Sequence, residues 1–116
     1  MTPPKEAAPP ESPEASRQTN DESSDCAERL RVLADRTRLE VVRLLFTGAK
    51  HVGELNESLA IDQSLLSHHL RVLREAGLVI GERDGKAVLY RLAPGVRVKA
   101  GQEAIHLGCC SLSFDS

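Results

Sequence analysis

Residues 62–77 read DQSLLSHHLRVLREAG, and this stretch decides the fold. Leu66, Leu70 and Leu73 recur at i, i+4 and i+7, the spacing of one face of an α-helix, so we expect this face to lie against a core. Asp62 is a suitable N-cap, and the final glycine is a suitable stop. The sequence therefore predicts one amphipathic helix with an exposed polar side.

The polar side of this helix has the chemistry of a DNA-reading surface. Its members are short, polar or basic: Ser64, Ser67, His68 and Arg71. Serine is short enough to let the helix backbone approach a groove. Gln63 can pair bidentately with adenine, and Arg71 can reach guanine or a phosphate. When this face is considered alone, an ordinary solvated surface is the favoured interpretation. The neighbouring elements must therefore decide whether it binds DNA.

Three shorter helices are predicted before it, over residues 26–34, 36–46 and 52–60. The first places Leu30, Leu33 and Ala34 on one face, and Asp25 is a suitable cap. The second follows an Asp35 cap and places four apolar residues at helical spacing, namely Leu39, Val42, Leu45 and Phe46. The third and the 62–77 helix together form a predicted helix-turn-helix.

A β-hairpin is predicted directly after the polar helix. LVIGER (78–83) and KAVLYRL (86–92) are β-rich, and the Asp84-Gly85 pair between them favours a tight turn. A hairpin in this position is a wing, with Arg83 and Lys86 flanking its tip near backbone phosphates. Either charge alone could be a solubilising edge residue. The combination favours DNA binding and a mostly α fold with a β-hairpin, a winged helix-turn-helix.

Length and composition are typical of one small domain. The chain has 116 residues, enough for one small domain, and dimerisation is a common way to add buried area. We expect a cytoplasmic homodimer without a membrane segment, because no apolar run is long enough and no secretion signal is visible. Three cysteines do not suit a disulfide scaffold, and a reducing cytosol favours free thiols.

The first 24 residues are predicted to be a disordered, acidic and proline-rich tail. Five of the six prolines lie there, with almost no large apolar side chain to offset the entropy of ordering. Repulsion of DNA is one role for such a tail, but inert solubilising sequence is favoured. The expected organisation is tail 1–24, winged-helix domain 25–93, and a dimerisation and sensor segment 94–116.

The last segment does not favour a long helix. One proline and several glycines oppose helix formation there: Pro94, Gly95, Gly101 and Gly108. Apolar residues and cysteines alternate instead, in two sets offset by one position: Ile105, Leu107 and Cys109, then Cys110, Leu112 and Phe114. This pattern predicts an extended end with a β-bulge near the cysteines.

Three motifs together resemble the ArsR/SmtB family of metal-responsive repressors. They are LRVLADRTRLEVVRLL, GELNESLAIDQSLLSHHLRVLREAGLV and the R-D-G-K-x-x-x-Y wing, within about residues 26–92. The resemblance implies a winged-helix homodimer that represses a double-stranded operator when ligand-free and needs no cofactor for DNA binding. It implies that Gln63, Ser64, Ser67 and His68 lie in or near the major groove. His69 falls on the inner edge, where a satisfied, semi-buried histidine is favoured.

Two sensor sites of that family have no counterpart here. One uses a Cys-x-Cys pair, where this chain has His51, Val52, Gly53 and Glu54. Another uses Asp and His ligands on a C-terminal helix. Residues 94–116 offer Glu103, His106 and Asp115 without the required spacing. Neither zinc site of these kinds is therefore expected.

The remaining ligand candidates are Cys26, Cys109 and Cys110. Soft thiolates select soft metals and metalloids, and two adjacent cysteines can hold one large ion. Some members of the family use a C-terminal cysteine pair for As(III) or Sb(III). Cys26 would be the third ligand, from the same or the opposite subunit, although a small buried hydrophobe is its alternative role.

The predicted function is a repressor that leaves its operator when As(III) or Sb(III) binds the three cysteines. A thiol redox trigger, disulfide or persulfide, and other inducers such as methylarsenite or cadmium remain alternatives. A thiol enzyme would need a phosphate-binding loop or an activating base that the chain does not provide, so no enzyme is expected. A metal-carrying or partner-binding protein on the same fold is the last alternative.

Overall fold

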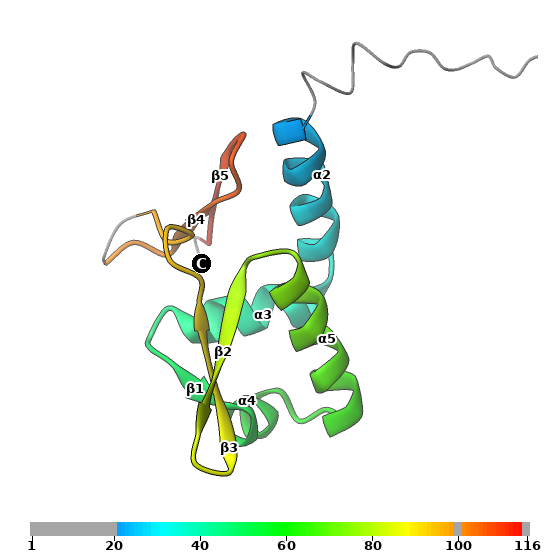
Figure 1. The fold of residues 1–116 in the computed structure, drawn as a ribbon, viewed down its shortest axis with the longest axis vertical. Helices are drawn as coiled ribbons and strands as arrows, with labels where there is room; N and C mark the ends of the chain where they lie inside the picture. The colour runs from blue at the N-terminus through cyan, green and yellow to red at the C-terminus, as the bar shows by residue number, and fades with distance from the viewer. Residues whose placement is uncertain (1–20, 99–100, 115–116) are drawn as a thin grey trace, which may run out of the picture.

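Four helices and two small antiparallel sheets make up the described part of the chain, residues 21–98 and 101–114 of a computed structural model (Figure 1). The helices are α2 (Asp21–Leu33), α3 (Arg36–Leu45), α4 (Val52–Leu59) and α5 (Gln63–Glu75). The strands are β1 (Lys50–His51), β2 (Val79–Asp84), β3 (Ala87–Leu92), β4 (Ala104–His106) and β5 (Ser111–Ser113). No helix of this described part is long and apolar enough to cross a membrane.

The helix starts follow the predicted caps with one exception. The Asp35 side chain accepts a hydrogen bond from the Arg38 backbone N–H at 3.0 Å, and Asp62 accepts one from Ser64 N–H at 3.1 Å. These bonds satisfy N–H groups that have no partner within the helix. The exception is α2, which begins at Asp21, so the predicted helix start at residue 26 after an Asp25 cap is wrong. The rest of the predicted tail, residues 1–20, lies outside the described residues.

The core forms where α3, α4 and α5 pack together under the sheet. The predicted inner face of α5 is confirmed, since Leu66, Leu70 and Leu73 are all buried. The predicted face of α2 is partly wrong. Leu33 is buried, but Leu30 is 44% exposed and Ala34 is also exposed.

The wing is a three-stranded sheet in the order β1-β3-β2. β2 and β3 are antiparallel, and Asp84 pairs with Ala87, so Gly85 and Lys86 are the turn residues. The predicted hairpin is confirmed, but its tip is one residue further along than Asp84-Gly85. Gly85 adopts φ +66°, which suits glycine in such a turn. The short β1 was not predicted; it pairs Lys50 with Tyr90 and thereby joins the wing to the start of α4.

The C-terminal segment forms a second hairpin instead of one bulged strand. β4 pairs with β5 in antiparallel register, with His106 opposite Ser111, so the chain reverses between them. The extended conformation was predicted correctly, but the bulge was wrong, because a turn accounts for the shift in alternation. Buried Ile105 and Leu107 attach the hairpin to the core, and the Phe114 ring meets Phe46 edge-on at 5.4 Å.

His69 is the buried polar side chain of α5. Its Nδ1 accepts a hydrogen bond from Arg38 Nε at 2.9 Å, and Arg38 also donates to the Val32 carbonyl. Burial lowers the pKa of His69. The Asp35 carboxylate opposes this shift, whereas Arg38 and His68 add to it. The neutral ring thus joins α5 to α3 and α2, as expected for a satisfied semi-buried histidine.

We expect acid to destabilise the fold through His69. Below about pH 6.5 the histidine is protonated in the unfolded chain, whereas the folded ring, whose pKa is lower, stays neutral. The free energy of unfolding therefore falls as the pH falls. His69→Gln keeps an acceptor for Arg38 and removes the titration. Urea unfolding is measured at about pH 7.5 and about pH 5.5. The free energy of unfolding should fall less between these two pH values in His69→Gln than in the wild type. An equal loss in both would contradict this role.

Candidate functional site

The outer face of α5 carries the side chains predicted to read DNA. All five are exposed: Gln63, Ser64, Ser67, His68 and Arg71. The Asp62 cap uses the Ser64 backbone N–H and leaves its hydroxyl outward. Because the opposite face is buried in the core, these side chains are held on a rigid helix and point away from the fold.

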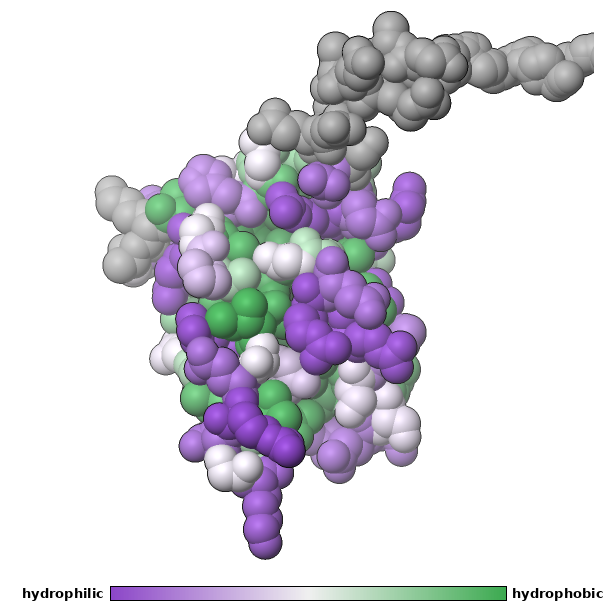
Figure 2. Space-filling model, in the orientation of Figure 1, coloured by the Kyte–Doolittle hydropathy of each residue, from purple (hydrophilic) through white to green (hydrophobic). Residues whose placement is uncertain are grey.

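The wing lies at the same end of the molecule as the start of α5 (Figure 1). Arg83 and Lys86 are both exposed, and Lys86 is at the turn itself. Hydrophilic residues, in purple, form the lowest tip of the molecule in the space-filling view (Figure 2). Two polar contacts brace the hairpin: His51 Nε2 to Asp84 Oδ2 at 2.8 Å, and Arg91 to Glu82 at 2.9 Å. These contacts were not predicted, because His51 and Asp84 are far apart in the sequence.

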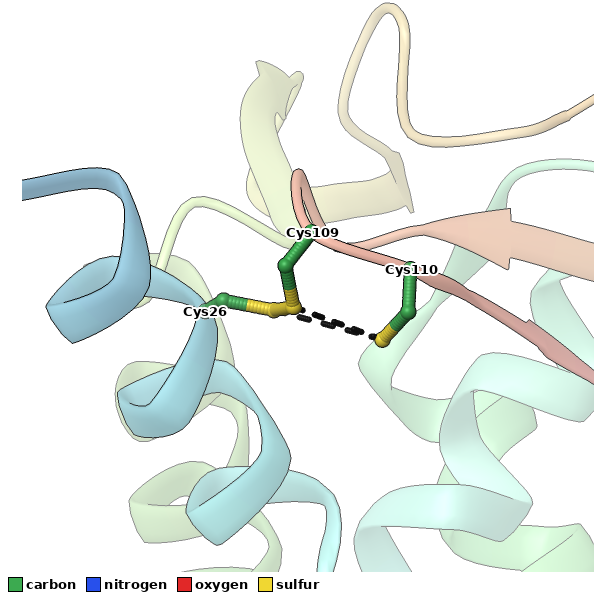
Figure 3. A group of neighbouring side chains, drawn as sticks. All are labelled: Cys26, Cys109 and Cys110. Carbon is green, nitrogen blue, oxygen red and sulfur yellow. Dashed lines mark hydrogen bonds between the residues drawn. A yellow bond between two sulfur atoms is a disulfide. The ribbon is translucent and has the colours of Figure 1, made fainter.

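The three cysteines converge at the other end of the fold, from α2 and from the turn between β4 and β5 (Figure 3). Cys26 and Cys109 are joined in a disulfide, with their Cα atoms 5.9 Å apart, so the expectation of free thiols is wrong for these two residues. The free Cys110 Sγ lies 3.5 Å from Cys109 Sγ and 4.0 Å from Cys26 Sγ. All three sulfur atoms therefore come from one subunit.

Besides the disulfide, the geometry suits the binding of one soft ion by the three sulfur atoms. The sulfur atoms lie within 4.8 Å of one another, and two thiolates on one soft ion are separated by at most about 4.6 Å when each metal–sulfur bond is about 2.3 Å. After reduction of the disulfide, one ion could thus contact all three with small movements. Cys26 is buried, whereas Cys109 and Cys110 are exposed, so a reagent reaches the cluster from the turn.

His106 does not belong to the cluster. Its Nδ1 contacts the Ser111 hydroxyl at 3.2 Å, across the β4–β5 ladder. The group of possible metal ligands found among the described residues consists of the three cysteines. A fourth, nitrogen ligand from His106 is therefore not supported.

Arg29 is a polar residue beside the cluster that sequence reasoning missed. It lies one turn after Cys26 and donates to two backbone carbonyls, those of Ala76 and Leu107. The sequence feature that could have identified Arg29 is its position three residues after Cys26, because residues at i and i+3 share a helix face. The two acceptors are backbone atoms, which no side-chain pattern identifies.

Comparison with known proteins identifies the family. A family model described as "Bacterial regulatory protein, arsR family" matches residues 35–80, which contain α3, α4 and α5. The chain is 37% identical over 81 residues to the transcriptional activator HlyU of Vibrio cholerae, covering 70% of this chain and 74% of HlyU. The chain belongs to the ArsR family. Membership in a family of regulatory proteins agrees with the expectation that it is not an enzyme.

Other relatives of this ArsR-family chain are named as repressors. The transcriptional repressor SmtB of Mycobacterium tuberculosis is 47% identical over 66 residues, 57% of this chain and 49% of SmtB. The arsenical resistance operon repressor of Escherichia coli is 43% identical over 67 residues, 57% of each chain. This chain spans about half the length of the first curated relatives that it matches.

Solved structures support the winged-helix fold. Reduced HlyU from V. cholerae aligns with a TM-score of 0.61 and 32% identity, covering 66% of this chain and 81% of that one. The Mycobacterium bovis protein Mb0332, described as a homodimeric winged helix-turn-helix DNA-binding domain, aligns with a TM-score of 0.63 and 25% identity, covering 72% and 76%. The mostly helical fold with a β-hairpin is thereby confirmed.

The thiol arrangement predicts an order of chemical labelling. In the oxidised protein iodoacetamide should label Cys110, and peptide mapping should find Cys26 linked to Cys109. In the reduced protein Cys109 and Cys110 should react before Cys26, because Cys26 is only 1% exposed. Tandem mass spectrometry separates the two adjacent cysteines. A Cys109–Cys110 disulfide, or fastest labelling of Cys26, would contradict the arrangement.

Proposed function

We propose that this chain is a homodimeric transcriptional repressor that binds operator DNA and is controlled by Cys26, Cys109 and Cys110. The observation that carries the proposal is the convergence of the three sulfur atoms within 4.8 Å, from segments far apart in the sequence. Because the cluster lies at the end of the fold opposite the wing, it can control DNA binding without touching DNA (Figure 1).

The DNA-binding part of the proposal rests on the exposed face of α5 and the basic wing. Gln63, Ser64, Ser67 and His68 would meet base edges in the major groove, and Arg71 would meet guanine or a phosphate. Arg83 and Lys86 would meet phosphates, which position the protein without reading sequence. Two copies would read half-sites one DNA turn apart, about 34–36 Å.

Dimerisation is supported by apolar surface around the predicted C-terminal dimerisation and sensor segment. Leu30 is exposed on α2, and a groove between the start of α3 and β5 is lined in part by Leu39, Leu112 and Phe114. The relative Mb0332 is described as homodimeric. A second copy would cover these side chains, and a change near the cluster would alter the spacing of the two α5 helices.

The inducer that we propose is a soft metalloid of the As(III) or Sb(III) type, bound by all three thiolates. The three-sulfur arrangement suits a ligand that accepts three soft donors. Binding requires that a cellular dithiol reductant first supply two electrons and two protons to the Cys26–Cys109 disulfide, becoming a disulfide itself, and that the thiols then lose their protons, so binding depends on pH. A relative carries the name arsenical resistance operon repressor.

A redox trigger is the second candidate, favoured by the disulfide itself. Oxidation of Cys26 and Cys109 by an external oxidant would transfer two electrons to it and link α2 to the β4–β5 turn. The two triggers need different residues. The disulfide uses Cys26 and Cys109, whereas the metalloid site also needs Cys110.

The first functional prediction concerns the reading face. Ser67→Ala with His68→Ala should weaken operator binding about tenfold or more, since base contacts contribute about 1–3 kcal/mol each. Binding should also fall steeply with salt. A fluorescence anisotropy titration with operator DNA measures both. The matched control, Ser111→Ala with His106→Ala, changes the same residue types in an exposed pair across the β4–β5 ladder, outside the proposed dimer groove, and should keep the wild-type affinity. Equal affinity of all three proteins would remove α5 from the interface.

The second functional prediction separates the triggers. With arsenite as the probe, Cys109→Ser and Cys110→Ser should both keep operator affinity and lose release from DNA, because serine supplies no soft ligand. With a mild disulfide-forming oxidant, Cys110→Ser should still respond, whereas Cys26→Ser and Cys109→Ser should not. Loss of arsenite release in Cys26→Ser as well as in Cys109→Ser and Cys110→Ser, alongside a normal response in the wild type, supports the three-thiolate site.

Two outcomes would contradict the proposal. If arsenite and oxidant both leave the wild type bound to its operator, the cluster is not the trigger. If X-ray absorption of the arsenite-loaded protein shows mainly oxygen neighbours, the cysteines are not the ligands. A two-sulfur shell with normal response in Cys26→Ser would instead restrict the site to Cys109 and Cys110.

A further inference from the structure

The guanidinium of Arg29 lies between the cysteine turn and the end of α5. Its Nη1 donates to the Leu107 carbonyl and its Nε donates to the Ala76 carbonyl, each at 3.1 Å. Gly108 and Gly77, the residues that follow these acceptors, flank the guanidinium: a Cβ at either would lie 3.6–3.7 Å from it. One planar side chain thus connects two turns that lie far apart in the sequence.

The first acceptor belongs to the cysteine turn. The Leu107 N–H donates to the Cys110 carbonyl at 2.8 Å, so the backbone of Leu107 is bonded to Cys110 on one side and to Arg29 on the other. Leu107 is fully buried, which fixes its position against the core. A shift of Cys109 or Cys110 relative to Cys26 therefore changes the geometry at the Leu107 carbonyl.

The second acceptor ends the helix that carries the reading face. Ala76 is the C-cap of α5, and its carbonyl is one of those left without a partner inside the helix. A cation at this end also interacts favourably with the helix dipole. From Ser64 to Ala76 the helix extends about 18 Å as a rigid rod, so a tilt at the capped end displaces the reading face.

We propose that Arg29 is the positioning residue that couples the state of the cysteine cluster to the orientation of α5. The inference rests on the proposed function, because it concerns the regulation of the same cluster. Cys26 and Arg29 share a face of α2, so the helix bearing one thiol also carries the coupling side chain. A change in sulfur bonding that moves the turn alters the Leu107 contact and, through the planar fork, the Ala76 contact.

Hydrogen exchange in the absence of DNA tests the coupling directly. The amides of Ala76, Gly77 and Leu78 donate to carbonyls of the last turn of α5, so their exchange rates report on this helix end. Between the reduced protein and the Cys26–Cys109 disulfide form, these rates should differ about fivefold or more in the wild type, the lower range of allosteric couplings. Arg29→Gln should lose that difference.

Arg31→Gln is the matched control. Arg31 lies on the same helix, is exposed, and contacts Glu28 at 3.0 Å, away from both turns. It should keep the difference between the two states. If Arg29 had only a structural role, Arg29→Gln would speed exchange equally in both states and leave the ratio of the two rates unchanged. That result, or a wild type whose α5 end exchanges equally in both states, overturns the proposal.

Arg29→Lys covers the case in which Arg29→Gln does not fold. Lysine keeps a cation at the end of α5 but lacks the planar fork that reaches two carbonyls. It should fold and still lose the difference between states; a full difference in Arg29→Lys overturns the coupling. Operator affinity is measured separately in both states. If the wild type shows the exchange difference but neither oxidation nor arsenite changes its operator affinity, the proposed function fails while the coupling stands.

Discussion

Burial of three leucines on one face of α5 is the constraint on which the rest of the structure depends. Leu66, Leu70 and Leu73 are almost completely removed from solvent, and each such side chain contributes about 1.5–3 kcal/mol. Because a helix is rigid, burying this face fixes the opposite face outward. The same packing places His69 against Arg38, which joins three helices at one point.

The C-terminal hairpin brings the three cysteines together at the end of the fold opposite the wing (Figure 1). Ile105 and Leu107 hold it against the core, and Phe114 meets Phe46. Its turn then reaches Cys26 on α2, across 83 residues of sequence. The buried position of Cys26 and the exposure of its two partners make the cluster both anchored and accessible, which suits a sensor more than a structural bridge.

The two ends of the molecule are connected by α5 and α2. The wing and the start of α5 lie at one end, and the cysteine turn meets the other end of α5 through Arg29 (Figure 1). In the function that we propose, this arrangement separates ligand capture from DNA reading.

The sequence by itself determined that the four helices exist, the caps of α3 and α5, and the β2–β3 hairpin, because hydrophobic spacing, Asp35, Asp62 and the turn glycine act locally. It also supplied the three cysteines as candidate ligands. Tertiary structure decided what depends on distant contacts: the pairing of β1 with β3, the reversal between β4 and β5, and the convergence of the sulfur atoms in one subunit. Arg29 belongs with these, since backbone carbonyls carry no side-chain pattern and only folding brings Ala76 and Leu107 to one guanidinium.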